Sequence, residues 1–382
     1  MEKYLDIDTL WNNIVASSIL STLVACLPNE SKELLCKNEI SILTSTSKLP
    51  LYNYATFCKV LSINCISKIV INVLKDEMSG KILVTEEIIK MFANQINSVR
   101  KLSYYSNYHQ LNFSFPYFPG LRDLSELRCN SNLSSDFYKQ LSQICRNLHI
   151  LSIDFEINYV QMNIIPALKN NSNTITKLCL YGCHNSSNLP FLFGGLSGDL
   201  LEVLRFSSYY IEDFIQLQHV NFLNLQTLKF SYHCPKHEHL MKFLENNGKN
   251  LKLFHMTNSN KALRLSIANL CPNLRSLFIV FNDDELNILK TIFNNCKYLE
   301  SIKIWCSSTI YDGKNYLVEE EVFETVANYS PNNFCELKIY NTSHFQISSK
   351  DLESFFISWK NRTPRKVLSL IILRTEKIFV QV

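Results

Sequence analysis

The sequence predicts an α/β fold in which short parallel strands alternate with helices along one continuous stack. Three observations predict this class: an apolar phrase that recurs about every 25 residues, apolar side chains at helical spacing between the phrases, and the lack of any glycine-, serine- or proline-rich joint. Hydrophobic residues make up 46% of the 382-residue chain, so each unit of the stack can contribute to a shared core.

The strand phrase consists of three apolar residues at its first, fourth and sixth positions. Its fourth position falls at Leu102, Leu127, Leu151, Leu178, Leu204, Leu228, Phe254, Leu277 and Ile302. The intervals run from 23 to 27 residues. They lie within the period of leucine-rich repeats, roughly 20 to 29 residues. Apolar residues at alternating positions, such as Leu178 and Leu180, share one face of a strand, so each phrase predicts a short strand with one buried face.

Three looser copies of the phrase predict strands at residues 66–71, 334–339 and 367–372. Longer intervals separate them from their neighbours, which indicates insertions or atypical terminal repeats. We therefore expect a leucine-rich-repeat domain of about twelve repeats over residues 66–382 and an N-terminal helical region over residues 1–65.

Between the phrases, apolar side chains change to a helical period. The groups are Leu240, Phe243 and Leu244; Leu286, Leu289, Ile292 and Phe293; Val318, Val322 and Val326; and Leu352, Phe355, Phe356 and Trp359. Each helix must bury this face against its strand and its neighbours. Because helices are wider than strands, we expect a leucine-rich-repeat solenoid (horseshoe) with the parallel sheet on its concave face.

Residues 14–27 form an apolar stretch near the N-terminus. The stretch is too short to span a membrane, which requires about 20 residues, and Glu2, Asp6 and Asp8 precede it where a signal peptide carries positive charge. We interpret it as an amphipathic helix and expect no membrane association.

Thirteen cysteines occur, an odd number. Cys145, Cys271 and Cys296 each stand three residues before a strand phrase, and recurrence at one position of the repeat favours a packing role. Free thiols of this kind indicate a reducing compartment, so we expect a cytoplasmic or nuclear protein.

Several phrases resemble a known family. Residues 271–277 (CPNLRSL) and 175–183 (ITKLCLYGC) resemble the cysteine-containing leucine-rich repeats of F-box proteins, the substrate receptors of SCF-type ubiquitin ligases. Residues 27–35 (LPNESKELL), 51–54 (LYNY) and 57–59 (FCK) resemble the segment that follows the F-box in a fungal family. The resemblance implies a substrate receptor that binds a Skp1-type adaptor if an F-box lies upstream. Only Leu10 and Trp11 match the end of an F-box, so the F-box itself is expected to be missing or truncated.

No phosphate-binding loop, nucleophile elbow or zinc-protease motif occurs in the sequence. We therefore expect no enzyme activity and no cofactor. Two clusters contain metal-ligand residue types, one of His233, Cys234, His237 and His239 and the other of Cys179, Cys183 and His184. We interpret the first as a polar loop and the second as structural, and expect no metal site.

The residue between the last two apolar positions of each phrase points to the opposite face of the sheet. Six of ten such positions are basic or histidine and none is acidic. Together with aromatic residues, they give the predicted binding residues, which are Arg128, Arg205, Lys229, His255, Phe278, Lys303 and Lys338, with Tyr181, Trp305 and Tyr340 at the next outward positions.

We hypothesise that this concave stripe binds an acidic or phosphorylated segment of a protein partner, with cations as anion contacts and aromatic rings as anchors. The alternative is a solvated sheet face whose charges are balanced by Glu202, Glu300 and Glu336.

The leading function is therefore a protein-binding module, a substrate receptor related to the F-box proteins. A repeat scaffold without a ligase link is the first alternative. Nucleic-acid binding is less favoured, because the net charge is only +4.

Overall fold

The structure is a computed structural model that describes residues 13–40, 54–75, 77–104, 114–155, 164–182, 189–194, 196, 199–207, 212–232, 234–306, 317–341, 348–364 and 366–374. The chain divides into two compact units, Met1–Ile175 and Thr176–Val382. In each unit the described strands follow one another in chain order and pair in parallel. This arrangement confirms the predicted α/β class, with parallel strands that alternate with helices.

The first unit contains four described strands. Its elements are α1 (Asn13–Ala25), α2 (Asn29–Lys37), the 3₁₀ helix η2 (Tyr54–Phe57), β1 (Val60–Ser62), α3 (Ile63–Val73), α4 (Met78–Gln95), β2 (Lys101–Tyr104), η3 (Pro119–Asp123), β3 (Glu126–Asn130), α5 (Ser135–Ile144), β4 (Ile150–Asp154) and α6 (Ile165–Asn170).

The second unit contains eight described strands. Its elements are β5 (Lys177–Tyr181), α7 (Leu189–Gly194), β6 (Val203–Ser207), η5 (Glu212–His219), β7 (Thr227–Phe230), α8 (His237–Asn247), η6 (Gly248–Asn250), β8 (Leu253–Met256), α9 (Lys261–Leu270), β9 (Ser276–Phe278), η7 (Asp283–Glu285), α10 (Leu286–Asn295), β10 (Ser301–Cys306), α11 (Glu319–Tyr329), β11 (Glu336–Asn341), α12 (Ser349–Lys360) and β12 (Ser369–Arg374).

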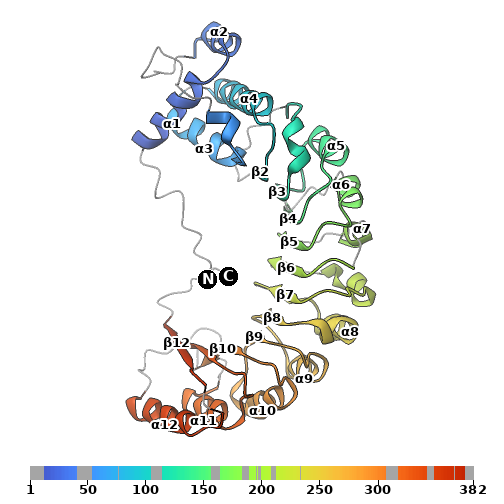
Figure 1. The fold of residues 1–382 in the computed structure, drawn as a ribbon, viewed down its shortest axis with the longest axis vertical. Helices are drawn as coiled ribbons and strands as arrows, with labels where there is room; N and C mark the ends of the chain where they lie inside the picture. The colour runs from blue at the N-terminus through green and yellow to red at the C-terminus, as the bar shows by residue number, and fades with distance from the viewer. Residues whose placement is uncertain are drawn as a thin grey trace. The chain divides into compact units, whose positions relative to one another are not determined.

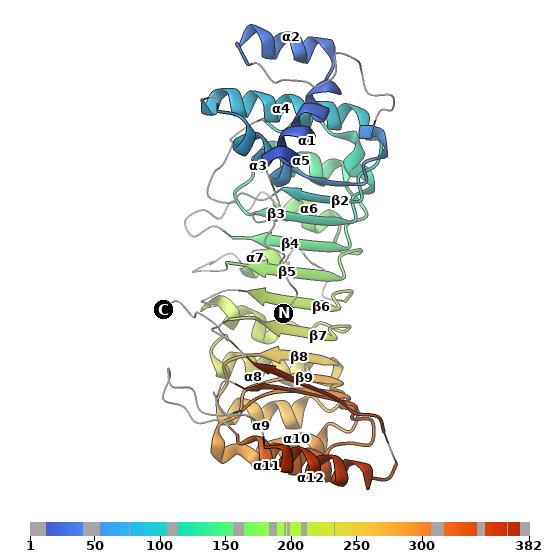
Figure 2. The same cartoon turned by 90° about the vertical axis from the view of Figure 1, so that its left-hand side faces the viewer.

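In the second unit the strands lie side by side like rungs (Figure 2), and helices α8 to α12 cover one face of the sheet (Figure 1). Leu204, Leu228 and Phe254 are fully buried, as the phrase predicts, and so are Leu240 and Phe243 of α8. We call the opposite side of β5–β12, which bears the residues between the apolar positions, the open face.

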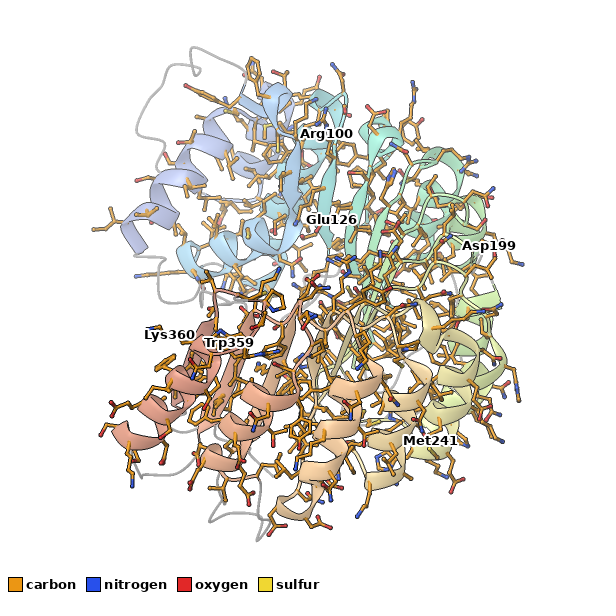
Figure 3. The ribbon with its side chains drawn as sticks, turned by 60° about the horizontal axis from the view of Figure 1, so that its bottom comes forward. Arg100, Glu126, Asp199, Met241, Trp359 and Lys360 are labelled. Atoms are coloured by element: carbon orange, nitrogen blue, oxygen red, sulfur yellow. The ribbon has the colours of Figure 1, made fainter. Side chains whose placement is uncertain are left out.

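The helices bury most of the predicted stripe, but Val318, the residue just before α11, is 51% exposed. On α12, Trp359 is 8% exposed and its Nε1 donates to the Lys366 carbonyl oxygen at 2.9 Å, whereas the next residue, Lys360, is exposed. Figure 3 shows both side chains on this helix. Phe356, which the sequence placed on the buried stripe, is 49% exposed.

Buried asparagines connect consecutive repeats. In the second unit, Asn247 accepts a hydrogen bond from the Phe222 backbone N–H at 2.7 Å and donates to the Val220 carbonyl oxygen at 2.8 Å. In the first unit, Asn171 accepts from the Leu148 backbone N–H at 3.1 Å and donates to the Cys145 carbonyl oxygen at 3.1 Å. These amides satisfy backbone groups at turns that would otherwise be buried without partners.

The cysteines that recur three residues before the strand phrase are buried, as their position in the repeat predicts. Cys145, Cys271 and Cys296 are fully buried, and the Cys296 thiol donates to the Cys271 carbonyl oxygen at 3.3 Å. Burial raises the pKa of Cys296 to about 12, so this thiol stays protonated and unreactive at neutral pH.

The strand expected at residues 66–71 is wrong, because helix α3 occupies this segment. Ile66 and Ile69 are buried on one side of the helix, and the Ser62 hydroxyl caps it by accepting from the Cys65 backbone N–H at 3.3 Å. A spacing of three residues fits a helix face and the strand phrase equally well. The strand lies just before, at β1, which pairs with β2.

The apolar stretch 14–27 contains the expected helix, α1, whose buried side includes Ala16, Leu20 and Val24. Among the described helices, none is by itself both long and apolar enough to span a membrane. The bent pair of Ile14–Ala25 and Asn29–Lys37 meets the length and composition limits when its two helices are taken together.

Candidate binding surface

The positions between the buried strand residues align across the second unit. The register pairs Arg205 with Lys229, Lys229 with His255, and His255 with Phe278. It continues from Phe278 to Lys303 and from Lys303 to Lys338. Since adjacent strands lie about 4.8 Å apart, these six residues form one line across the open face. We call them, with Trp305 and Tyr340, the basic-aromatic row.

Two predicted residues lie apart from this row. Arg128 belongs to β3 in the first unit, where it pairs with Ser103 and Ser152 in register. Tyr181 belongs to β5 and pairs with Ser207 of β6. The structure thus brings eight of the ten predicted residues into the row.

The centre of the row is an aromatic cluster that holds a cation. The Lys303 Nζ lies 4.4 Å from the ring centroid of Phe278 and 4.1 Å from that of Tyr340. Trp305 stacks on Tyr340 with centroids 5.8 Å apart, and the His255 ring lies 4.4 Å from Phe278. The ring faces attract the ammonium through their quadrupoles, so Lys303 is held in place by residues from neighbouring strands.

This cluster corrects the expectation of aromatic anchors for two residues, Phe278 and Tyr340. Phe278 is only 6% exposed and Tyr340 only 8%. Lys303 lies over both rings and covers them within the chain itself. The sequence pattern gave the side of the sheet correctly but could not show that neighbouring side chains cover the rings.

The cluster shifts the pKa values of His255 and Lys303. Burial, together with the nearby cations Lys303, Lys229 and Arg205, lowers the pKa of His255 to about 3, so this imidazole is neutral at pH 7. Burial and the neighbouring Lys338 lower the pKa of Lys303 to about 8. Lys303 is therefore still mostly protonated at pH 7 but close to its titration.

Glu336, two residues before Lys338 on β11, neutralises part of the row. Lys338 Nζ lies 2.7 Å from Glu336 Oε1, and the Ser301 hydroxyl donates to the same oxygen. Burial alone would raise the pKa of Glu336, but the hydrogen bonds from Lys338 and Ser301 outweigh it and lower this pKa. Glu336 is thus the balancing charge for Lys338 that the sequence suggests, whereas the part played by the Ser301 hydroxyl is visible only in the structure.

The other two proposed balancing charges lie elsewhere. Glu300 pairs with Arg275 at 3.2 Å, outside the row. Glu202 forms no ion pair with the part of the chain that the structure describes. Charge balance by glutamate is therefore seen for Lys338 and not for Arg205.

The two metal candidates of the sequence fall partly outside the described residues, which include neither His233 nor Cys183 and His184. Within the described ranges, no group of three or more His, Cys, Asp or Glu side chains is placed to hold a metal ion.

Comparison with known proteins gives little similarity. No protein-family profile matches the chain, and no curated protein sequence matches it. Among solved structures, the chain is similar to one in the crystal structure of the Rad7 and Elc1 complex from yeast, with 12% identity, a TM-score of 0.38, and coverage of 94% of this chain and 92% of that one. A likeness at this level assigns neither a family nor a function.

Proposed function

We propose that this chain is a protein-binding repeat module that receives an acidic segment of its partner on the basic-aromatic row. The observation that supports this proposal is the register. Among the described row positions on β5–β12, Arg205, Lys229, Lys303 and Lys338 are cationic, and no position is acidic. A parallel ladder thus lines up charges that lie far apart in the sequence.

The spacing of the cations defines the segment that fits. They form two neighbouring pairs, Arg205 with Lys229 and Lys303 with Lys338. Lys229 and Lys303 are three strand steps apart, about 14 Å at 4.8 Å per step. An extended chain covers this distance in about four residues at 3.3 Å each. The occupant is therefore a segment with acidic residues about four positions apart and a non-acidic stretch between them that passes over His255 and Phe278.

The experiment compares wild type with Arg205→Glu/Lys229→Glu on an array of acidic peptides with this spacing. Charge reversal of one cation pair is expected to weaken binding at least tenfold, since each ionic hydrogen bond contributes about 1.5–3 kcal/mol. Lys139→Glu/Lys169→Glu, on exposed positions of α5 and α6, reverses the same charge elsewhere and serves as control. Equal binding by the row variant and the wild type would contradict the proposal.

The finer role that the sequence resemblance implies is a substrate receptor of an SCF-type ubiquitin ligase in the cytoplasm or nucleus. We expect the expressed chain to co-purify with a Skp1-type adaptor if it has this role. A chain that binds acidic peptides without the adaptor is instead a repeat scaffold. Binding of RNA or DNA in place of peptides, with affinity that falls steeply with salt, would favour the nucleic-acid alternative.

A further inference from the structure

A second surface of the second unit lies at the edge where the chain runs into strands β7 to β10. It is a groove of about 340 Å³, and we call it the edge groove. The residues that matter for its chemistry are Leu223, Lys249, Lys252, Arg275 and Tyr298. None of them belongs to the basic-aromatic row.

Asparagine side chains along the edge groove donate hydrogen bonds to backbone carbonyl groups of the preceding repeat. The Asn250 Nδ2 donates to the Leu223 carbonyl oxygen at 2.9 Å, and the Asn273 Nδ2 donates to the Lys249 carbonyl oxygen at 2.8 Å. Each asparagine precedes the first leucine of its strand phrase, so the same hydrogen bond recurs in consecutive repeats. At the next repeat, Tyr298 takes the place of the asparagine, and its side chain is 54% exposed. These bonds link consecutive repeats along the groove, and an exposed phenol ring lines it.

The edge groove has an excess of positive charge. Lys249 and Lys252 form no ion pair with any carboxylate in the described ranges. Arg275 is paired with Glu300 at 3.2 Å, but both side chains remain about half exposed. Leu223, 54% exposed, lies on the opposite border from Tyr298. Two unpaired ammonium groups between two apolar borders fit an anionic group attached to an apolar neighbour.

We propose that the edge groove binds one anionic side chain of a peptide, a phosphate or a carboxylate, together with an adjacent hydrophobic residue. The ammonium groups of Lys249 and Lys252 contact the anion. The hydrophobic neighbour packs against one of the two borders, Leu223 or Tyr298.

A single side-chain anion fits the charges around the edge groove better than a chain of phosphates does. Glu300 lies beside Arg275, with their charged groups 3.2 Å apart. A nucleic-acid strand would carry further phosphates past this carboxylate, where like charges repel. A single anionic side chain held by Lys249 and Lys252 avoids this repulsion.

The test measures binding of fluorescently labelled decapeptides by anisotropy at low salt. The peptides have random flanks and a fixed central phosphoserine, glutamate or serine, and a ten-nucleotide single-stranded RNA is measured beside them. We expect phosphoserine or glutamate peptides to bind more tightly than serine peptides. Lys249→Gln/Lys252→Gln is expected to weaken this binding about tenfold, which corresponds to about 1.4 kcal/mol. Comparison of the phosphoserine and glutamate peptides identifies which anion the groove prefers.

Two variants separate the edge groove from other effects. Lys236→Gln/Lys242→Gln removes the same two charges from exposed positions at the start of α8 and on its surface, and should bind as wild type. Arg205→Glu/Lys229→Glu disables the row. If only the row variant loses peptide binding, the groove proposal is overturned and the proposed function stands. Unchanged binding by the groove variant, no binding to any peptide, or tighter binding of RNA than of every peptide would also overturn it.

Discussion

The buried ion pair between Arg264 of α9 and Glu285 of η7 gives the sharpest prediction about stability. Their side chains are 2% and 1% exposed, and Arg264 Nη2 lies 2.7 Å from Glu285 Oε1. Arg264 Nη1 also donates to the Val280 carbonyl oxygen at 2.7 Å and to the Ser259 carbonyl oxygen at 3.0 Å. One guanidinium thus ties the segment that follows β9 to α9.

Arg264→Met would remove this charge while keeping most of the side-chain volume. The Glu285 carboxylate would stay buried without its cation, and two carbonyl oxygens would lose a donor. Breaking a buried pair from one side costs about 3–5 kcal/mol, so we expect the free energy of unfolding of the second unit to fall by about this amount. Replacing both residues with apolar ones, in Arg264→Met/Glu285→Leu, removes the uncompensated charge and should recover at least about 2 kcal/mol of the loss.

Urea unfolding followed by tryptophan fluorescence measures this loss, because Trp305 and Trp359 both lie in the second unit. Lys261→Met is the matched control. It removes a pair between the same two elements, Lys261 with Asp284 at 3.6 Å, but both side chains are more than 60% exposed. An exposed pair contributes less than about 1 kcal/mol. If Arg264→Met cost no more than Lys261→Met, or if the double variant recovered nothing, the reasoning about the buried charge would be refuted.

Three further predictions follow from packing and titration. Gly248→Ala would place a Cβ 2.6 Å from the Leu270 carbonyl oxygen, so we expect a loss of about 1–3 kcal/mol in the same assay, whereas Gly194→Ala, with nothing within 4 Å, should be neutral. The folded state lowers the pKa of His255 from 6.5 to about 3, so protons bind the unfolded chain preferentially as pH falls from 6.5 towards 3. Wild type should therefore lose more stability over this window than His255→Gln. Equal stability profiles of the two proteins against pH would contradict this. Lys303, with its pKa lowered to about 8, should lose its charge between pH 7 and 9, so affinity for acidic peptides should fall over this range in wild type and less in Lys303→Arg, as anisotropy titrations would show.

The strands could be predicted from the sequence because one local rule determines them. Leu204 and Leu228 occupy the fourth position of the phrase and are fully buried, because in every repeat the strand buries its apolar face in the shared core. The rule fails at Ile66 and Ile69, where the same spacing forms a helix. The choice there depends on the cap at Ser62 and on packing between helices, which a short phrase does not contain.

The alternation of side chains along a strand predicts the face of the sheet on which the row lies. It does not predict which side chains of the row are exposed. Alternation places Phe278, Lys303 and Tyr340 on the open face. Whether an aromatic ring is open to a partner depends on which side chains stand beside it on neighbouring strands, and here Lys303 covers both rings. The edge groove cannot be predicted from the phrase for a similar reason. Lys249 and Lys252 precede β8 and Arg275 precedes β9, at positions whose residue type the phrase leaves undefined.

Because the strands pair one residue to one residue, the gain of a repeat during evolution changes the binding surface in a defined way. From β6 to β11, each repeat contributes one residue to the line that runs from Arg205 to Lys338, as Lys229 and His255 do from β7 and β8. Duplication of one repeat therefore lengthens this line of residues by one strand, about 4.8 Å. The residues on either side of the new strand keep their chemistry. Gene duplication within the array adjusts the distance between charges, while point substitutions adjust their sign, and the two routes of divergence act independently.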